Sequence, residues 1–169
     1  MHTQREKDDF LKLLSENQGI IIKICNSFHR DKADREDLAQ EIIYNLWKGG
    51  GSYNPDFKFS TWMYRVALNV AISSYRKEKK LKQTIVFSAK PLEMEDKIFS
   101  PPESEENSNL LQQHITELKE LDKALMILYF EEKSYKEIAE IIGISETNVA
   151  TKVSRIKEKL KQNIMNSKK

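Results

Sequence analysis

Aromatic and cationic side chains are interleaved in one stretch of the chain, between residues 52 and 82. A nucleic-acid base stacks on an aromatic ring with about 1–3 kcal/mol, while cations follow the phosphate backbone. The pattern therefore favours a surface for single-stranded nucleic acid. The aromatic candidates are Tyr53, Phe57, Phe59, Trp62, Tyr64 and Tyr75, and the cations are Arg65, Arg76, Lys77, Lys79, Lys80 and Lys82. Phe59 and Trp62 could instead be core residues, and both interpretations stay open.

A second group of candidates lies on two predicted helices near the end of the sequence. Ser134 and Glu137 form a capping box that opens a short helix, Gly143 ends it, and Ser145 caps the next helix. Two capped helices joined by a glycine turn are typical of the DNA-reading helix-turn-helix. The predicted inward stripe of the last helix is Val149, Val153, Ile156 and Leu160. The outward residues are Thr147, Ala150, Thr151, Ser154, Arg155 and Glu158, with Lys152 on the flank.

These outward side chains suit the major groove of DNA. Small residues let a helix approach base edges, Arg155 could form a bidentate contact with guanine, and Lys152 and Lys157 could hold phosphates. The alternative is an ordinary helical hairpin with a solvated basic face. The capping box, the turn glycine and the inward stripe together favour the helix-turn-helix.

Groups suited to catalysis or metal binding are sparse. Cys25 is the only cysteine, which excludes a disulfide framework, and the three histidines at positions 2, 29 and 114 lack ligand spacing. Asp37 and Glu41 lie on one predicted helical face, but no histidine or third carboxylate joins them at a suitable spacing. We therefore expect no cofactor, no metal site and no enzymatic activity.

Three helices are predicted to position the first group of residues. Apolar residues from Phe10 to Phe28 follow one helical face, which makes Cys25 a core residue. A second helix begins near Asp34, a good N-cap, and stops at the glycine run 49–51. Ser60 is predicted to cap a long third helix that ends in the basic stretch. Its inward residues are Trp62, Met63, Val66, Ala67, Val70 and Ala71.

Segment 85–107 is predicted to be a linker, because helical periodicity fades and three prolines and six acidic residues occur in it. Fully extended, it would reach roughly 75 Å at about 3.3 Å per residue. Periodicity resumes at Leu110, with a break near Glu132 and Lys133. The sequence thus predicts an all-α protein of two small helical domains, 1–84 and 108–169, joined by a flexible linker. The second is a four-helix domain that contains the helix-turn-helix.

Length and charge fit two small nucleic-acid-binding domains. A chain of 169 residues excludes one large enzyme core. The net charge of +2 is distributed as +4 (15 basic, 11 acidic), −4 (2 basic, 6 acidic) and +2 (11 basic, 9 acidic) over 1–84, 85–107 and 108–169. Both domains could therefore meet a polyanion. No stretch approaches the roughly 18–20 apolar residues of a membrane span, and the charged start is unlike a signal peptide, so we expect a cytoplasmic protein.

Two blocks of the sequence strongly resemble regions 2 and 4 of bacterial RNA polymerase sigma factors. The first block comprises DLAQE (37–41), FSTWMYRVA (59–67), Asn69 and the basic stretch from Arg76. The second comprises YKEIA (135–139), GIS (143–145), Val149, Arg155, Lys159 and Leu160. Only the short linker separates the blocks, with no region-3 domain and no N-terminal extension. This organisation resembles the compact extracytoplasmic-function (ECF) class.

The resemblance implies specific partners and roles. Core RNA polymerase would bind at Asp37, Leu38, Gln40 and Glu41 through the clamp coiled coil of its largest subunit, and its flap region would face Glu131 and nearby residues. A base flipped from the minus-ten promoter element would be captured by the 52–59 loop, including Phe57, Lys58 and Phe59, and by Asn69, in a pocket that Trp62 supports. Arg65, Arg76, Lys79 and Lys80 complete that surface. The minus-thirty-five element would be read by Thr147, Asn148, Ala150, Thr151, Lys152, Ser154 and Arg155. The acidic linker would either occupy the nucleic-acid channel of the polymerase or serve solubility alone.

The sequence departs from the family pattern at two places. Ile72 and Ser73 stand where charged or amide residues are frequent, and Asn148 and Ala150 stand where threonine and a basic residue are frequent. The second departure predicts an altered minus-thirty-five preference rather than a loss of binding.

The predicted function is that of a promoter-specificity subunit. It would bind core polymerase, direct it to promoters and help to open the duplex, and an anti-sigma factor is a further candidate partner. The alternative is a stand-alone helix-turn-helix regulator, which would need a dimer seam or an effector pocket that the remaining helices do not show.

Overall fold

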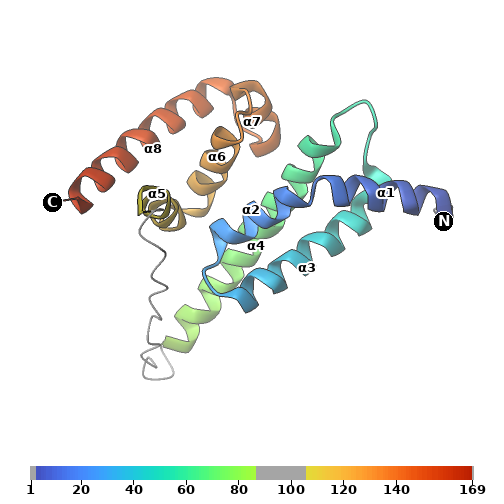
Figure 1. Cartoon of the computed structure of the whole chain (residues 1–169), viewed down its shortest axis with the longest axis horizontal. Helices are drawn as coiled ribbons and strands as arrows, with labels where there is room; N and C mark the ends of the chain where they lie inside the picture. Colours follow the sequence, from blue (N-terminus) through green and yellow to red (C-terminus); the bar gives the residue numbers. More distant parts are fainter. Residues whose placement is uncertain (1–2, 87–105, 169) are drawn as a thin grey trace.

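The computed structural model describes residues 3–86 and 106–168, and every regular element within these ranges is helical. The first domain contains α1 (Gln4–Glu16), α2 (Gln18–Phe28), α3 (Lys32–Gly49), the 3₁₀ turn η1 (Gly50–Ser52) and α4 (Phe59–Val86). The second contains α5 (Glu106–Thr116), α6 (Glu120–Phe130), α7 (Tyr135–Ile142) and α8 (Glu146–Ser167). The predicted all-α fold with two helical domains is confirmed (Figure 1). Most of the predicted linker, 87–105, lies outside the described residues.

Helices α2, α3 and α4 pack together around the core of the first domain. Their buried apolar residues recur every three or four positions, as a helix with one core-facing stripe requires. The core includes Ile24, Cys25, Phe28, Leu38, Ile42, Leu46, Met63, Ala67 and Ala71. Cys25 is therefore a core residue, as predicted, and burial raises the pKa of its thiol to about 11.

The single helix predicted from Phe10 to Phe28 is wrong, because the chain forms two helices that meet at Asn17. The side-chain amide of Asn17 donates to the Leu13 carbonyl at 2.8 Å, and its backbone leaves helical geometry with φ −111° and ψ 13°. Asparagine side chains compete for backbone groups in this way and so interrupt helices. The break lets α1 turn, and Phe10 contacts the rings of Trp47 and Trp62.

Two other predicted helix starts are displaced. The N-cap of α3 is Asp31, and Asp34 lies in the first turn. Helix α4 begins at Phe59, so Ser60 is a helical residue rather than the cap. The end of α4 at Val86 also extends beyond the predicted domain limit at residue 84.

The helix-turn-helix forms as predicted from α7 and α8. Ser134 Oγ accepts from the Glu137 backbone N–H at 3.1 Å, and Glu137 accepts from the Ser134 N–H at 3.3 Å. Gly143 adopts φ +84°, a left-handed conformation that favours glycine, and Ser145 Oγ accepts from the Asn148 N–H at 3.2 Å. The predicted inward stripe is buried at Val149, Val153, Ile156 and Leu160.

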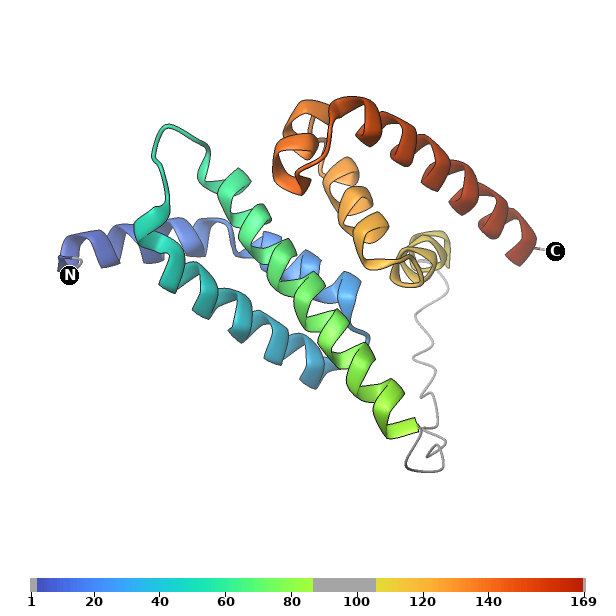
Figure 2. The same cartoon turned by 180° about the vertical axis from the view of Figure 1, so that it is seen from behind.

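The two domains contact each other. Helices α2 and α4 pack against α6, α2 also contacts α5, and α4 also contacts α7 (Figures 1 and 2). Helix α8 lies on the outer side of the second domain, away from the first domain. Within the described ranges, no helix combines the length and the apolar character that a membrane crossing requires.

Candidate nucleic-acid interface

The loop between η1 and α4 is built on an aromatic cluster. Tyr53, Phe59 and Trp62 have ring centroids 5.3–5.4 Å apart, and Phe10 adds an edge contact to Phe59 at 5.9 Å. The Tyr53 hydroxyl donates to the Phe57 carbonyl at 2.9 Å. Such edge and tilted ring contacts stabilise a pair by about 0.5–1.5 kcal/mol each. The cluster thus holds the loop in one conformation before any ligand binds.

The structure shows which aromatic residues are buried in the core and which are exposed for contact with a base. Phe59 is only 7% exposed, so its predicted contact with DNA does not fit this structure, and it supports the loop instead. Tyr64 is buried as well and is not available for base stacking. Phe57 is 63% exposed, and Trp62 is half-buried with part of its ring accessible. Phe57 therefore presents its ring to solvent, whereas Trp62 is supported by the aromatic cluster.

Several predicted contacts share one exposed face of α4. Lys58 precedes the helix, and Trp62, Arg65, Asn69 and Arg76 follow at spacings of three, four and seven residues. Lys58, Arg65, Asn69, Arg76, Lys79 and Lys80 are all exposed. This face joins the aromatic loop to the basic stretch at the end of α4. It provides a ring for stacking, an amide for hydrogen bonding and cations for phosphates.

The second candidate surface is the outer face of α8. Thr147, Asn148, Thr151, Ser154 and Arg155 are exposed, whereas Ala150 and Lys152 are half-buried. The Thr151 hydroxyl donates to the Thr147 carbonyl at 3.0 Å, which leaves its oxygen as an acceptor for a base or water. Within the described parts of the chain, Arg155 forms no hydrogen bond or ion pair that would fix its guanidinium group. The exposed face is therefore polar and carries a cation, as contact with a DNA groove requires.

A third surface lies on α3, where predicted and unpredicted residues combine. Asp37, Gln40 and Glu41 are exposed as expected, whereas Leu38 is 2% exposed and packs in the core, so in this structure it does not present its side chain to a partner. Ile43, Tyr44 and Trp47 are exposed next to this polar group, Tyr44 by 62%. Their positions fall outside the buried stripe, which was the sequence signal that could have revealed them. Exposed apolar groups rimmed by polar ones are typical of protein-binding surfaces.

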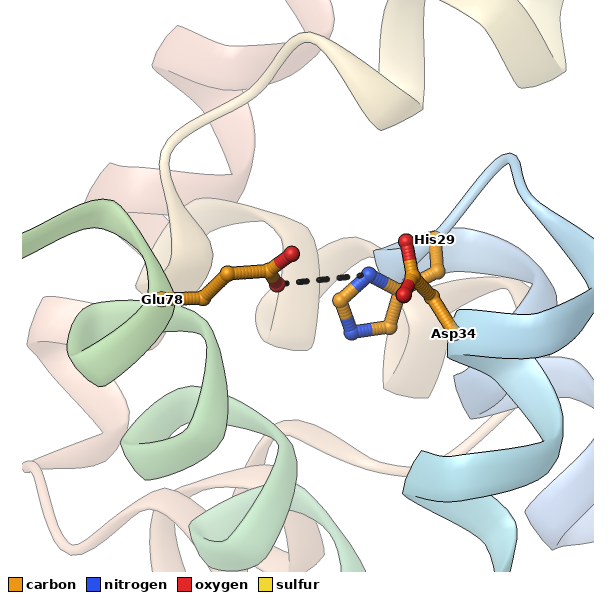
Figure 3. Close-up of side chains that lie close together, drawn as sticks. All are labelled: His29, Asp34 and Glu78. Carbon is orange, nitrogen blue, oxygen red and sulfur yellow. Dashed lines mark ion pairs between the residues drawn. The ribbon is translucent and has the colours of Figure 1, made fainter. Parts of the chain in front are cut away.

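One cluster of potential metal ligands was not expected. No metal site is predicted from the spacing of the histidines, yet the structure brings His29, Asp34 and Glu78 together from three elements (Figure 3). Their ligand atoms all lie within 4.8 Å of one another. Asp37 and Glu41, the pair considered from sequence, do not belong to such a group of three in the described parts of the chain.

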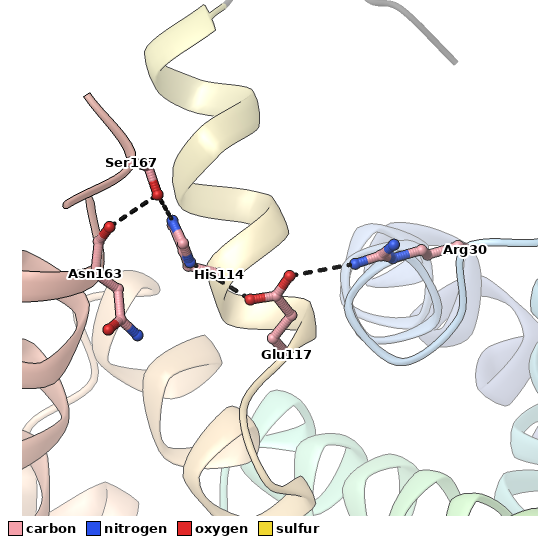
Figure 4. Close-up of polar contacts among 5 residues, drawn as sticks. All are labelled: Arg30, His114, Glu117, Asn163 and Ser167. Atoms are coloured by element: carbon pink, nitrogen blue, oxygen red, sulfur yellow. Dashed lines mark hydrogen bonds and ion pairs between the residues drawn. The ribbon is translucent and has the colours of Figure 1, made fainter. Parts of the chain in front are cut away.

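The contact between the domains uses cations of the first and acids of the second. Arg76 Nε pairs with Glu120 Oε1 at 2.9 Å, Lys58 with Glu137 at 3.8 Å, Arg30 with Glu117 at 3.8 Å, and Lys23 with Glu131. The Arg76 hydrogen bond lowers the pKa of the Glu120 carboxyl. Figure 4 shows how the Arg30 pair continues into the second domain through Glu117, His114 and Ser167. Two predicted DNA-binding cations, Lys58 and Arg76, are thus paired with second-domain carboxylates.

The contact between the domains also includes a buried lysine. Lys123 of α6 is 1% exposed, and its Nζ lies 4.8 Å from the Phe28 ring centroid and 5.2 Å from that of Tyr75. Burial lowers the pKa of its ammonium group to about 8. At another point of the contact, burial and then the Glu131 carboxylate raise the pKa of Tyr64, whose ring lies 5.5 Å from Lys133 Nζ. Sequence periodicity could not reveal these residues as buried, because their partners belong to the other domain.

Comparison with known families and proteins matches both halves of the chain to one family. Residues 13–81 match Sigma-70 region 2, and residues 108–160 match Sigma-70, region 4. The chain is 30% identical to the ECF RNA polymerase sigma factor SigW of Bacillus subtilis, over 94% of this chain and 90% of that protein. It is 32% identical to the ECF RNA polymerase sigma factor SigM of the same organism, over 83% and 86%.

Two solved structures share the fold. The sigma factor RpoE, in complex with the anti-sigma factor NepR from Bartonella quintana, superposes with a TM-score of 0.72 and 17% identity, covering 93% of this chain and 97% of that one. CnrH, in complex with the cytosolic domain of CnrY, superposes with a TM-score of 0.68 and 18% identity, covering 96% and 91%.

Proposed function

The chain belongs to the sigma-70 family of RNA polymerase sigma factors, in its ECF subfamily, and we propose that it directs core polymerase to promoters through the surfaces described above. The observation that carries this proposal is the presence of two different exposed nucleic-acid surfaces, one on each domain, beside a separate mixed polar and apolar surface on α3. A stand-alone regulator would need only one nucleic-acid surface, that of the helix-turn-helix. No cofactor is required for this role.

In this proposal the first domain binds and opens the minus-ten element. Phe57, Trp62 and Asn69 receive a flipped base, and the cations at Arg65, Arg76, Lys79 and Lys80 hold the separated strand. Flipping a base costs a few kcal/mol, which stacking and polar contacts in a shaped site offset. The preformed aromatic cluster supports this assignment, since a loop that is already ordered loses little entropy on binding.

We assign the binding of core polymerase to α3 and to the α6–α7 corner. Asp37, Gln40 and Glu41, with the adjacent Tyr44, would contact the clamp coiled coil. The flap would dock at a hollow of about 490 Å³ between α6 and α7, where Phe130 and Tyr135 are exposed. Glu131 itself faces the first domain through Lys23, so its neighbours are the better candidates for the flap contact.

The second domain would read the minus-thirty-five element with α8. Thr147, Asn148, Thr151, Ser154 and Arg155 would face the major groove, and Lys152 would contact the backbone from its flank. One of the similar structures is a sigma factor in complex with an anti-sigma factor, which supports an anti-sigma factor as a partner of this chain too. This function would place the protein in the cytoplasm with the polymerase.

The deciding experiment is run-off transcription with purified core polymerase on a library of promoter fragments, with and without this protein. We expect defined start sites that depend on the protein. Sequence-specific DNA binding without any change in start sites would instead support the stand-alone regulator.

The α3 surface can be tested separately. Changing Asp37, Gln40 and Glu41 together to alanine removes exposed groups only, so the helix content should stay unchanged by circular dichroism. We expect the amount of core polymerase that co-purifies with the protein to fall about tenfold, because these three residues form only part of the interface. The matched control changes the exposed residues Asp8, Asp9 and Lys12 of α1, and equal loss in both variants would remove α3 from the interface.

A further inference from the structure

We infer that His29, Asp34 and Glu78 form a binding site for a divalent transition-metal ion, with zinc as the ion to test. His29 is the C-cap residue of α2, Asp34 lies in the first turn of α3, and Glu78 lies near the end of α4. Figure 3 shows Glu78 directed towards the imidazole ring of His29, with the Asp34 carboxylate overlapping the ring in this view. Three elements of the first domain therefore converge on one point.

The geometry is close to that of a three-ligand metal site. Because the three ligand atoms lie within 4.8 Å of one another, some point lies within about 2.8 Å of all three. Zinc binds imidazole nitrogen and carboxylate oxygen at about 2.0–2.2 Å, so each donor needs to move by less than about 1 Å. Side-chain rotation at the half-buried Asp34 and Glu78 can supply such a movement. The fourth position of a tetrahedral ion would remain open to water.

The donor set selects the class of ion. One imidazole and two carboxylates suit zinc and its neighbours in the first transition row, whereas magnesium and calcium prefer oxygen ligands alone. His29 Nδ1 and Glu78 Oε2 are 3.7 Å apart, beyond hydrogen-bond distance. The His29 side chain is only 10% exposed, so its ring is already held in place.

The position of the site suggests its consequence. Glu78 lies between Lys77 and Lys79 in the basic stretch of α4, so a bound ion would fix that stretch to the α2–α3 corner. It would also compensate two negative charges beside cations that are proposed to bind DNA. A metal that binds only the folded protein stabilises it.

The test is direct binding of zinc to the full chain, without polymerase or DNA. Zinc affinity is measured by competition with a chromophoric chelator, and thermal unfolding is followed with and without zinc. We expect one zinc per chain and a melting temperature raised by several degrees. His29→Gln, Asp34→Asn and Glu78→Gln should each weaken zinc binding at least ~10-fold and abolish the thermal shift.

The matched controls make the same kinds of substitution at residues outside the proposed site. Glu36→Gln alters an exposed carboxylate of α3, and His114→Gln alters the histidine of the second domain, so both should bind zinc within about twofold of the parent chain. If His29→Gln unfolds, the two near-isosteric carboxylate variants carry the test. Three results would each overturn the inference: no zinc binding up to about 100 μM, zinc binding by all three site variants that equals that of the parent chain, or tighter binding of magnesium than of zinc. None of these outcomes bears on the proposed promoter function.

Discussion

Arg155 is the residue on α8 whose chemistry most directly predicts base recognition. Its exposed guanidinium can donate two parallel hydrogen bonds to guanine, and loss of such a contact costs about 1–3 kcal/mol. We expect Arg155→Ala to weaken binding of the holoenzyme to the minus-thirty-five element by that amount, but to leave binding to a scrambled element nearly unchanged. Promoter competition assays measure both affinities.

Lys161, farther along the exposed side of α8, provides the matched control. If Lys161 contacts a phosphate, Lys161→Ala should weaken binding to both sequences equally. If Arg155→Ala also weakens both sequences equally, its assigned role in base readout is incorrect.

Gly143 tests how the turn holds the two DNA-reading helices together. Its φ of +84° is unfavourable for any residue with a Cβ, although the space around a new Cβ is open. Gly143→Ala should therefore lower the free energy of unfolding by about 1–2 kcal/mol through backbone strain alone. Gly19→Ala, in α2 with equally open surroundings and ordinary φ, should leave stability unchanged or raise it by up to about 1 kcal/mol. Urea unfolding measures both, and equal effects would contradict the strain argument.

At the scale of elements, the end of α4 should contribute to DNA binding by charge rather than by shape. Lys79 and Lys80 are exposed and follow the face that carries Arg65 and Asn69. Each lysine that neutralises a phosphate releases about 0.7–0.9 counterion. Lys79→Gln with Lys80→Gln should therefore reduce the slope of log affinity against log salt by about 1.4–1.8. Titrations of a promoter fragment at several salt concentrations measure that slope.

The same double change at Lys12 and Lys32, exposed on α1 and α3, should leave the slope unaltered. A slope that does not change in the α4 variant would show that these lysines remain in solvent when DNA binds.

The elements that sequence predicted best are those fixed by local interactions. The limits of α7 and the start of α8 follow from two serine caps and a glycine, all of which act within four residues. The break at Asn17 was missed because the apolar stripe continues in register across it. The burial of Tyr64 and the cluster at His29 could not be predicted, since both depend on residues distant in the sequence. Only the polar part of the exposed side of α3 was predicted, because its exposed apolar residues show no charge pattern in the sequence.

At the scale of the molecule, the contact between the domains conflicts with simultaneous binding to both promoter elements. The minus-ten and minus-thirty-five elements are about 25 base pairs, or roughly 85 Å, apart along DNA. In this structure the domains touch, and Lys58 and Arg76 pair with Glu137 and Glu120 instead of phosphates. We therefore expect the domains to separate when the protein joins polymerase and DNA, with the DNA backbone replacing the second-domain carboxylates.

Lys123 makes this separation dependent on pH. Its pKa is about 8 in the closed contact and about 10.5 in solvent, so the separated form binds more protons between these values. The closed form should gain up to about 1.4 kcal/mol per pH unit from pH 8 towards 10. Above about pH 10 the gain reverses, because Tyr64 ionises more readily when exposed. Small-angle X-ray scattering should therefore show a smaller radius of gyration at pH 9.5 than at pH 7.5. Lys123→Met keeps an apolar stem against Phe28 and Tyr75 but cannot titrate, so it should be closed at both pH values. Lys119→Met, on the exposed start of α6, should behave like the parent chain. A pH dependence that survives in Lys123→Met would assign the effect to another group.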